Sequence, residues 1–261
     1  MTVACTLLLD MSPLPVVYDG VQQPELDIVS VPALPMLVPH YKPRDHNQWL
    51  RQVLGHQIPR ARIMAFNYGS DIKESDSRDG ITSWKMLLEH AIALLLGLTI
   101  RREGVERRPI IFALLVAKEQ YQFRYILEHT AGIVFLGCLH DETNPQFEDL
   151  CIKCAAVEFG TMKKTELLKK SDDWHTIKEV MERFRTLDAP FQVRGFFELR
   201  PTMYQVGRFS VMRKSECLCP RPLSSLGWDN EKIIGVNANH EQIITYPHRI
   251  FFQMFKSKNH F

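Results

Sequence analysis

Two closely spaced cysteine pairs carry the residue type that binds zinc. Cys151-x-x-Cys154 and Cys217-x-Cys219 could together offer four thiolates to Zn²⁺. Cys151 and Cys154, however, lie in an apolar-periodic stretch, Phe147 to Phe159, that predicts a helix. Closely spaced cysteines that bind zinc usually lie in compact loops called zinc knuckles and not within a helix. We therefore interpret these cysteines as small core or surface residues. We therefore expect no metal and no cofactor.

Nucleophilic catalysis needs a hydroxyl or thiol displayed beside a base, and the chain offers few candidates. Its sequence contains no Gly-x-Ser-x-Gly turn and no Gly-x-x-x-x-Gly-Lys-Ser/Thr phosphate loop. Cys138 is a candidate substitute nucleophile, but it would need a depressed pKa and a suitable turn. We interpret Cys138 instead as a buried small side chain, which is far commoner.

The elements that would position such residues alternate between strands and helices. Short apolar runs predict strands, and apolar residues at helical spacing predict helices. The expected strands are Leu26–Val31, Arg62–Tyr68, Pro109–Phe112, Gly132–Gly137, Val193–Glu198 and Phe209–Met212. The expected helices are Trp49–Leu54, Trp84–Leu98, Ala113–His129, 146–159 and 163–187. This alternation predicts an α/β fold with a mostly parallel sheet and helices on both faces.

The same pattern suggests one main domain with two short flanking segments. Residues 1–24 contain Pro13, Pro15 and Pro24 and no sustained period, so we expect a loose leader there. We expect a single domain over residues 25–250 and a tail over residues 251–261.

The junction between Phe112 and Ala113 does not fit this pattern. No Gly, Pro, Asn, Asp or Ser lies between Ile110 and Tyr125, although a strand should end and a helix begin there. Such connections usually take about 2–6 residues. A connecting turn is therefore missing at this point.

Five short segments in this order resemble a known family. They are Leu26–Val29, Pro59–Tyr68, Arg107–Phe112, Gly132–His140 and Asn237–His240. Together they resemble the lipase-like α/β-hydrolases that include serine-active-site-containing proteins. The resemblance is nearest to the fungal branch, which occurs alone or ahead of NACHT, NB-ARC or ankyrin modules, and it covers residues 24 to 245. It implies a shortened α/β-hydrolase fold.

The resemblance also assigns catalytic roles and reveals a gap in them. The family follows the segment that ends at Phe112 with a Gly-His-Ser-x-Gly-Gly turn that lifts the serine above the sheet. That nucleophile elbow is absent here. His240 matches the family's general base, and Glu198 matches the acid that orients it and stabilises its protonated form.

Two loops of the family are also altered. Many relatives have His-Gly after the first strand, where this chain has Val31 and Pro32. Proline has no N–H to donate, so Ala33 and Leu34 are the oxyanion-loop candidates. His140 follows the family's Thr-Pro-His-Arg-Gly loop only in part, and we expect it to be structural or to position the loop.

Composition excludes several other classes of function. The 32 basic and 30 acidic side chains leave a net charge of +2 and no basic stripe, so we expect no nucleic-acid partner. The start of the chain lacks a basic region, and the apolar run 91–98 is too short to cross a bilayer. We expect no signal peptide, no transmembrane segment and a cytosolic location with reduced thiols.

Three functional hypotheses follow. The first is a hydrolase-like protein related to lipases and esterases that is inactive because it lacks the elbow. The second is an active ester or lipid hydrolase whose sequence here lacks an internal segment, with an acyl ester or lipid as substrate. The third is an interaction or signalling module that acts through a protein partner.

Overall fold

The computed structural model of this chain describes ten stretches of residues: 14–20, 23–31, 50–67, 84–105, 108, 110–111, 124–159, 173–186, 191–205 and 213–245. They divide into two compact units, each described below by itself. The first unit comprises Met1–Leu34, Pro43–Lys73 and Thr82–Ile133. The second comprises Pro35–Lys42, Glu74–Ile81 and Val134–Phe261. Strand β5 begins in the first unit and ends in the second.

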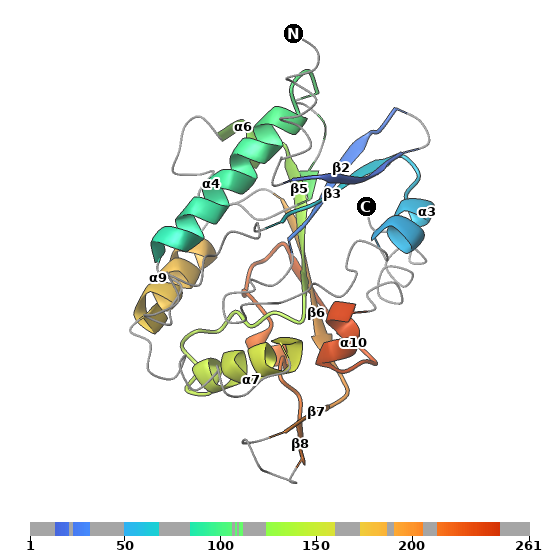
Figure 1. Ribbon diagram of the computed structural model, residues 1–261. Helices are drawn as coiled ribbons and strands as arrows, with labels where there is room; N and C mark the ends of the chain where they lie inside the picture. The colour runs from blue at the N-terminus through green and yellow to red at the C-terminus, as the bar shows by residue number, and fades with distance from the viewer. Residues whose placement is uncertain are drawn as a thin grey trace. The chain divides into compact units, whose positions relative to one another are not determined.

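The first unit is built on short, mostly parallel strands (Figure 1). They are β1 (Val16–Asp19), β2 (Leu26–Ser30), β3 (Ala61–Ala65), β4 (Ile110–Ile111) and the start of β5 (Thr130–Leu136). Their order is β1-β3-β2-β4-β5. Strand β2 is parallel to both β3 and β4, and β4 is parallel to β5, whereas β1 is antiparallel to β3.

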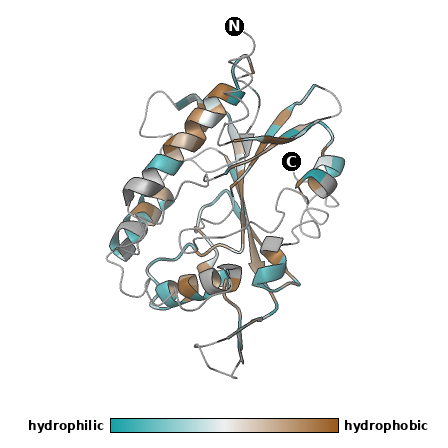
Figure 2. Cartoon of the chain, in the orientation of Figure 1, coloured by the Kyte–Doolittle hydropathy of each residue, from teal (hydrophilic) through white to brown (hydrophobic). Residues whose placement is uncertain are grey.

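The helical elements of the first unit alternate with these strands along the chain. They are a short π-helical turn, η1 (Leu50–Leu54), followed by α3 (Gly55–Gln57), α4 (Trp84–Arg101) and α6 (Arg124–Glu128). Hydrophobic residues recur along α4 and along the strands (Figure 2). Leu98 of α4 and Ile63 and Met64 of β3 are fully buried, so these elements form the unit's core.

The second unit contains the end of β5 and two further parallel strands. These are β6 (Gln192–Glu198) and β9 (Glu231–Val236), which pair in continuous register from Val193 opposite Glu231 to Glu198 opposite Val236. The backbone N–H of Gly137, just after β5, donates to the carbonyl of Phe196 in β6 at 2.9 Å. Both β6 and β9 therefore end on the side of the unit where β5 ends.

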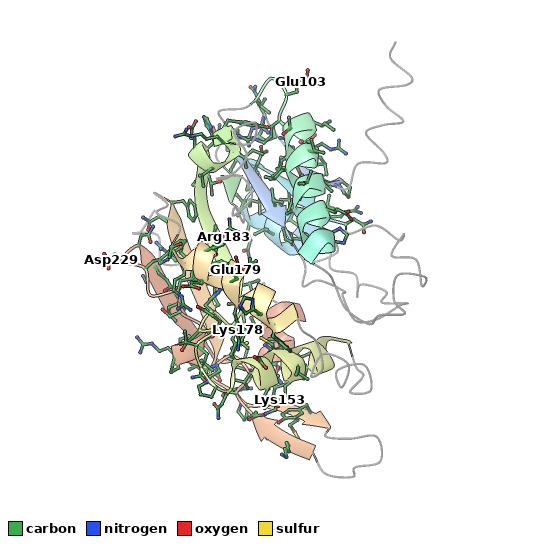
Figure 3. All side chains as sticks on the ribbon, turned by 90° about the vertical axis from the view of Figure 1, so that its left-hand side faces the viewer. Glu103, Lys153, Lys178, Glu179, Arg183 and Asp229 are labelled. Carbon is green, nitrogen blue, oxygen red and sulfur yellow. The ribbon has the colours of Figure 1, made fainter. Side chains whose placement is uncertain are left out.

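The remaining elements of the second unit are helices and one hairpin. They are α7 (Phe147–Phe159), α9 (Asp173–Arg185), η4 (Arg221–Leu223), α10 (His240–Thr245) and the antiparallel pair β7 (Thr202–Gln205) and β8 (Arg213–Glu216). Figure 3 shows the charged side chains of Lys178, Glu179 and Arg183 along α9. Lys178 Nζ lies 2.6 Å from Glu148 of α7, so an ion pair connects the two helices.

Two hydrophobic clusters hold the second unit together. Phe196, Val236 and Ile243 pack between β6, β9 and α10. Leu150 of α7 packs with Tyr204 of the hairpin and with Leu218 and Leu223. The hairpin and the residues that follow β8 are thus fixed against α7.

Most of the expected elements are present in the described residues, and the α/β class with a mostly parallel sheet is confirmed. One difference lies in residues 16–19, which we placed in a loose leader but which form β1 at a sheet edge. The single domain expected over residues 25–250 stays a prediction, and the residues described in this range belong to two compact units. The expected strand Phe209–Met212, the start of the helix over 163–187 and the tail 251–261 lie outside the described residues. Among the described helices, none combines the length and apolarity that crossing a membrane requires.

Candidate functional site

Glu198 and His240 follow the ends of two neighbouring parallel strands. Glu198 is the last residue of β6, and His240 begins α10 four residues after β9 ends at Val236. Both side chains are buried, with exposed fractions of 2% for Glu198 and 1% for His240. Since β6 and β9 are paired and parallel, their carboxyl ends meet at one edge, which brings these two residues into the same region.

Glu198 is connected to His240 through Thr202 and Cys219. One Glu198 oxygen, Oε2, accepts a hydrogen bond from the Thr202 hydroxyl at 2.9 Å. The other, Oε1, accepts one from the backbone N–H of Cys219. The Thr202 oxygen in turn accepts the backbone N–H of His240 at 2.8 Å. Among the described residues, no direct hydrogen bond joins Glu198 to His240, so the expected acid–base contact is not formed.

The imidazole of His240 faces a thiol instead. Its Nδ1 lies 3.5 Å from Cys219 Sγ. Gly137 lies against the ring, and a Cβ built on this glycine would be 3.2 Å from Nδ1. Gly137 also has a φ of +60°, which side chains of L-residues disfavour. A glycine is thus required here both by backbone conformation and by the close approach of the ring.

Cys219 has three polar neighbours and one proton to share among them. Its Sγ lies 2.9 Å from the carbonyl oxygen of Gly137, 3.7 Å from Cys154 Sγ and 3.5 Å from His240 Nδ1. The carbonyl can only accept, so the S–H proton of Cys219 is directed at Gly137. The sulfur then accepts from Cys154 and from an N–H at Nδ1 of His240.

The thiol of Cys219 is therefore neutral and shielded from water. Its hydrogen bond with Cys154, together with its burial, raises its pKa well above the ordinary value for cysteine. The residue has no exposed surface. A reactive cysteine needs both a thiolate and access to a substrate, and Cys219 has neither.

Cys138 and His140, in the loop after β5, do not complete a catalytic arrangement. Cys138 is half-buried, and its Sγ lies 3.6 Å from the carbonyl of Leu136. The His140 ring is buried against Phe135, with 4.4 Å between ring centroids, and burial lowers its pKa to about 4. The backbone N–H of His140 donates to the Leu223 carbonyl at 2.6 Å, which ties the loop after β5 to η4.

Two expected parts of the site lie outside the described residues. These are the oxyanion-loop candidates Ala33 and Leu34 and the junction between Phe112 and Ala113. The last described residue before the oxyanion loop is Val31, which follows β2 and is 38% exposed. The expectations for these positions therefore stay predictions.

The structure brings the predicted residues Glu198 and His240 into one region, and the sequence analysis did not predict the residues that link them. Thr202 gives no signal beyond its place four residues after Glu198. Cys154 and Cys219 are 65 residues apart, and each belongs to a different one of the two closely spaced cysteine pairs. The sequence analysis considered all four cysteines together as zinc ligands, whereas the structure brings one cysteine from each pair into contact.

Comparison with known proteins gives no further guide to the family. No protein-family model matches the chain, and no curated protein sequence matches it.

Proposed function

We propose that this chain is an α/β-hydrolase-like protein, related to lipases and esterases, that does not catalyse ester hydrolysis as its sequence stands and acts through a protein partner. A cytosolic location is part of the proposal and rests on the cysteine content. The chain order of Glu198 and then His240 supports the hydrolase-like part, because acid and histidine follow one another in this order in α/β-hydrolases.

The contact between Cys219 and His240 is the observation that carries the inactive part. In a hydrolase triad a carboxylate bonds the Nδ1–H of the histidine and stabilises the imidazolium that forms during catalysis. Here a neutral sulfur lies at Nδ1, and both oxygens of Glu198 accept other donors. A neutral thiol stabilises a cationic ring far less than a carboxylate does, so the ring is a poor general base.

The topology of the first unit supports a binding surface of the hydrolase type. Strand β3 lies on one side of β2, and β4 lies on the other, so the strand order reverses at β2. Ligands of open α/β sheets bind beyond the carboxyl ends of the strands at such a point. Ala33 and Leu34 come soon after β2 in the sequence, which agrees with their assignment to an oxyanion loop.

The decisive test is active-site labelling of the purified chain. A fluorophosphonate probe and p-nitrophenyl esters of different acyl length should give no covalent adduct and no hydrolysis above the buffer rate. An intact lipase-like hydrolase serves as the positive control, and His240→Ala as the matched variant. Covalent labelling by the wild type that disappears in His240→Ala would refute the proposal.

The alternative is an active serine hydrolase whose sequence here lacks a segment. The missing turn between Phe112 and Ala113 favours it, because both flanks resemble the family. Reading the transcript between these two codons separates the alternatives. An in-frame Gly-His-Ser stretch would establish the alternative, with the serine as nucleophile. A transcript that joins the two codons directly would remove it.

A further inference from the structure

We propose that Cys154, Cys219 and His240 form a Zn²⁺ site in the second unit. The ligand atoms of these three residues lie within 4.8 Å of one another. This reverses the interpretation from sequence, in which the cysteines are plain packing residues. The inference does not rest on the proposed function, because it concerns metal binding and not hydrolysis.

Two of the three distances agree with tetrahedral zinc. Zn–S bonds of about 2.3 Å and Zn–N bonds of about 2.0 Å, at the tetrahedral angle, put two sulfurs about 3.8 Å apart and a sulfur and a nitrogen about 3.5 Å apart. The two sulfurs of Cys154 and Cys219 are 3.7 Å apart, and Cys219 Sγ is 3.5 Å from Nδ1 of His240. The ion would therefore need little movement of Cys219 or His240.

The third distance requires a small adjustment of Cys154. The ligand atoms of Cys154 and His240 are at most 4.8 Å apart. Bringing them to about 3.5 Å takes a shift of up to about 1.3 Å (4.8 minus 3.5). Cys154 lies on α7 and is half-buried, whereas Cys219 and His240 are fully buried, so Cys154 is the least enclosed of the three ligands.

The backbones of the other two ligand residues are held in place by hydrogen bonds to buried side chains. The backbone N–H of Cys219 is bonded to Glu198, and the backbone N–H of His240 is bonded to Thr202. Gly137 packs against the His240 ring. These contacts fix the backbone positions from which the two ligand side chains extend. Glu198 and Thr202 thus have a role in the site that triad chemistry does not give them.

Zinc binding balances charge inside this buried cluster. One Zn²⁺ replaces the thiol protons of Cys154 and Cys219, and two protons are released. The proton of the His240 ring moves from Nδ1 to Nε2, so that Nδ1 can bind the ion. The ion with two thiolates and a neutral imidazole then has no net charge. The contact between Cys219 Sγ and the Gly137 carbonyl has to lengthen, because the proton between them leaves. Three protein ligands leave the fourth tetrahedral position for water.

The test is metal binding by the full chain with variants of neighbouring cysteines as matched controls. We expect the metal-free wild type to bind one Zn²⁺ per chain, and Co²⁺ to give sulfur-to-metal charge-transfer absorption. Removing a residue that supports a metal ligand typically costs about 10–100-fold in affinity, and removing a ligand itself costs more. Cys154→Ser and Cys219→Ser should therefore each weaken zinc binding by at least about 100-fold. Cys151→Ser and Cys217→Ser should bind as the wild type does.

X-ray absorption of the zinc-loaded wild type avoids any dependence on the folding of the variants. We expect two sulfur neighbours at about 2.3 Å and lighter nitrogen or oxygen neighbours in the remaining positions. The proposal is overturned by a wild type that takes up no zinc or by a spectrum without sulfur ligands. A resident disulfide between Cys154 and Cys219 in metal-free protein would also overturn it. None of these results bears on the labelling experiment above.

Discussion

Gly137 is the residue whose replacement reports most directly on the environment of His240. Its φ of +60° disfavours any side chain, and an added Cβ would lie 3.2 Å from Nδ1 of the ring. Gly227 has a similar φ of +77° but nothing within 4 Å of its Cβ position, so it isolates the backbone part of the effect. Each left-handed residue costs about 1–2 kcal/mol, and crowding in a packed core costs about 1–3 kcal/mol more.

We therefore predict that Gly137→Ala lowers the free energy of unfolding more than Gly227→Ala does, by about 1 kcal/mol or more. Urea denaturation of the two variants and the wild type measures this difference. If the two variants lose equal stability, the ring of His240 is not packed against Gly137 as described.

At the level of single residues, the sequence predicts positions better than partners. The apolar run that ends at Glu198 predicts a strand end there, and the structure has Glu198 as the last residue of β6. His240, which lies in a segment that resembles the family, begins α10 just after β9. The resemblance also predicts that Glu198 orients the imidazole of His240. In the structure, the two carboxylate oxygens of Glu198 accept hydrogen bonds from Thr202 and Cys219. Such pairings arise from the path of the hairpin after β6, and no local period in the sequence records that path.

At the level of elements, one buried carboxylate connects three strands and a helix end. Asp27 of β2 is fully buried and accepts hydrogen bonds from Arg62 of β3 at 2.9 Å and from Arg108, just before β4, at 3.0 Å. Arg102, which follows α4 and is also fully buried, donates to the same carboxylate at 2.5 Å. Three guanidinium groups therefore converge on one acid in the first unit.

Removing that charge should destabilise the first unit strongly. Breaking a buried ion pair by removing one partner costs about 3–5 kcal/mol, because the other charge stays buried without compensation. We predict a loss of this size for Asp27→Asn. Glu25→Gln is the matched control, since Glu25 pairs with Arg60 at the surface and both side chains are 57% exposed. Exposed pairs contribute about 0–1 kcal/mol.

Urea denaturation gives the free energy of unfolding of the two variants, and hydrogen exchange of the amides in β2, β3 and β4 shows whether the loss of stability lies in these strands. Fast exchange in Asp27→Asn alone supports the role of the carboxylate. Equal, small effects in both variants would show that the arginines find other partners.

The elements were predictable where the apolar pattern is strong and were missed where it is weak. Strand β2 and helix α7 match their expected ranges within a residue or two. Strand β1 was missed because Pro13 and Pro15 precede only four residues, and because an edge strand needs just one partner, β3. Strand β9 contains two charged residues, Glu231 and Lys232, that weaken its apolar pattern. Short edge elements depend on their neighbours, which a single sequence does not reveal.

For the whole molecule, the alternation of strands and helices is enough to predict the α/β class, but the division into two units is not. The boundary falls within β5, between Ile133 and Val134, and no change in composition marks it. The partners of Asp27 are also not predictable from the sequence. An acid in an apolar strand gives no hint that Arg62, Arg102 and Arg108 will surround it. Long-range charge pairing is set by the folded chain as a whole.

The stability of the folded chain should depend on pH through His140. Burial, aided by the nearby Arg185, lowers the pKa of this ring from 6.5 to about 4, although Glu231 acts in the opposite direction. The unfolded chain therefore binds a proton at higher pH than the folded chain does. Between pH 6.5 and about 4, stability falls as the pH falls, and above 6.5 the contribution of His140 is fully present.

A shift of this size corresponds to about 3 kcal/mol between neutral pH and pH 4, since each unit of pKa is worth about 1.4 kcal/mol. We predict that His140→Gln makes the unfolding free energy fall less steeply over this range, even if it is less stable at pH 7. His175→Gln, which alters an exposed histidine on α9, should keep the wild-type slope. Urea titrations at a series of pH values, followed by tryptophan fluorescence, give the three slopes. Identical slopes for wild type and His140→Gln would mean that the ring is hydrated in the folded chain, because burial is the largest cause of its lowered pKa.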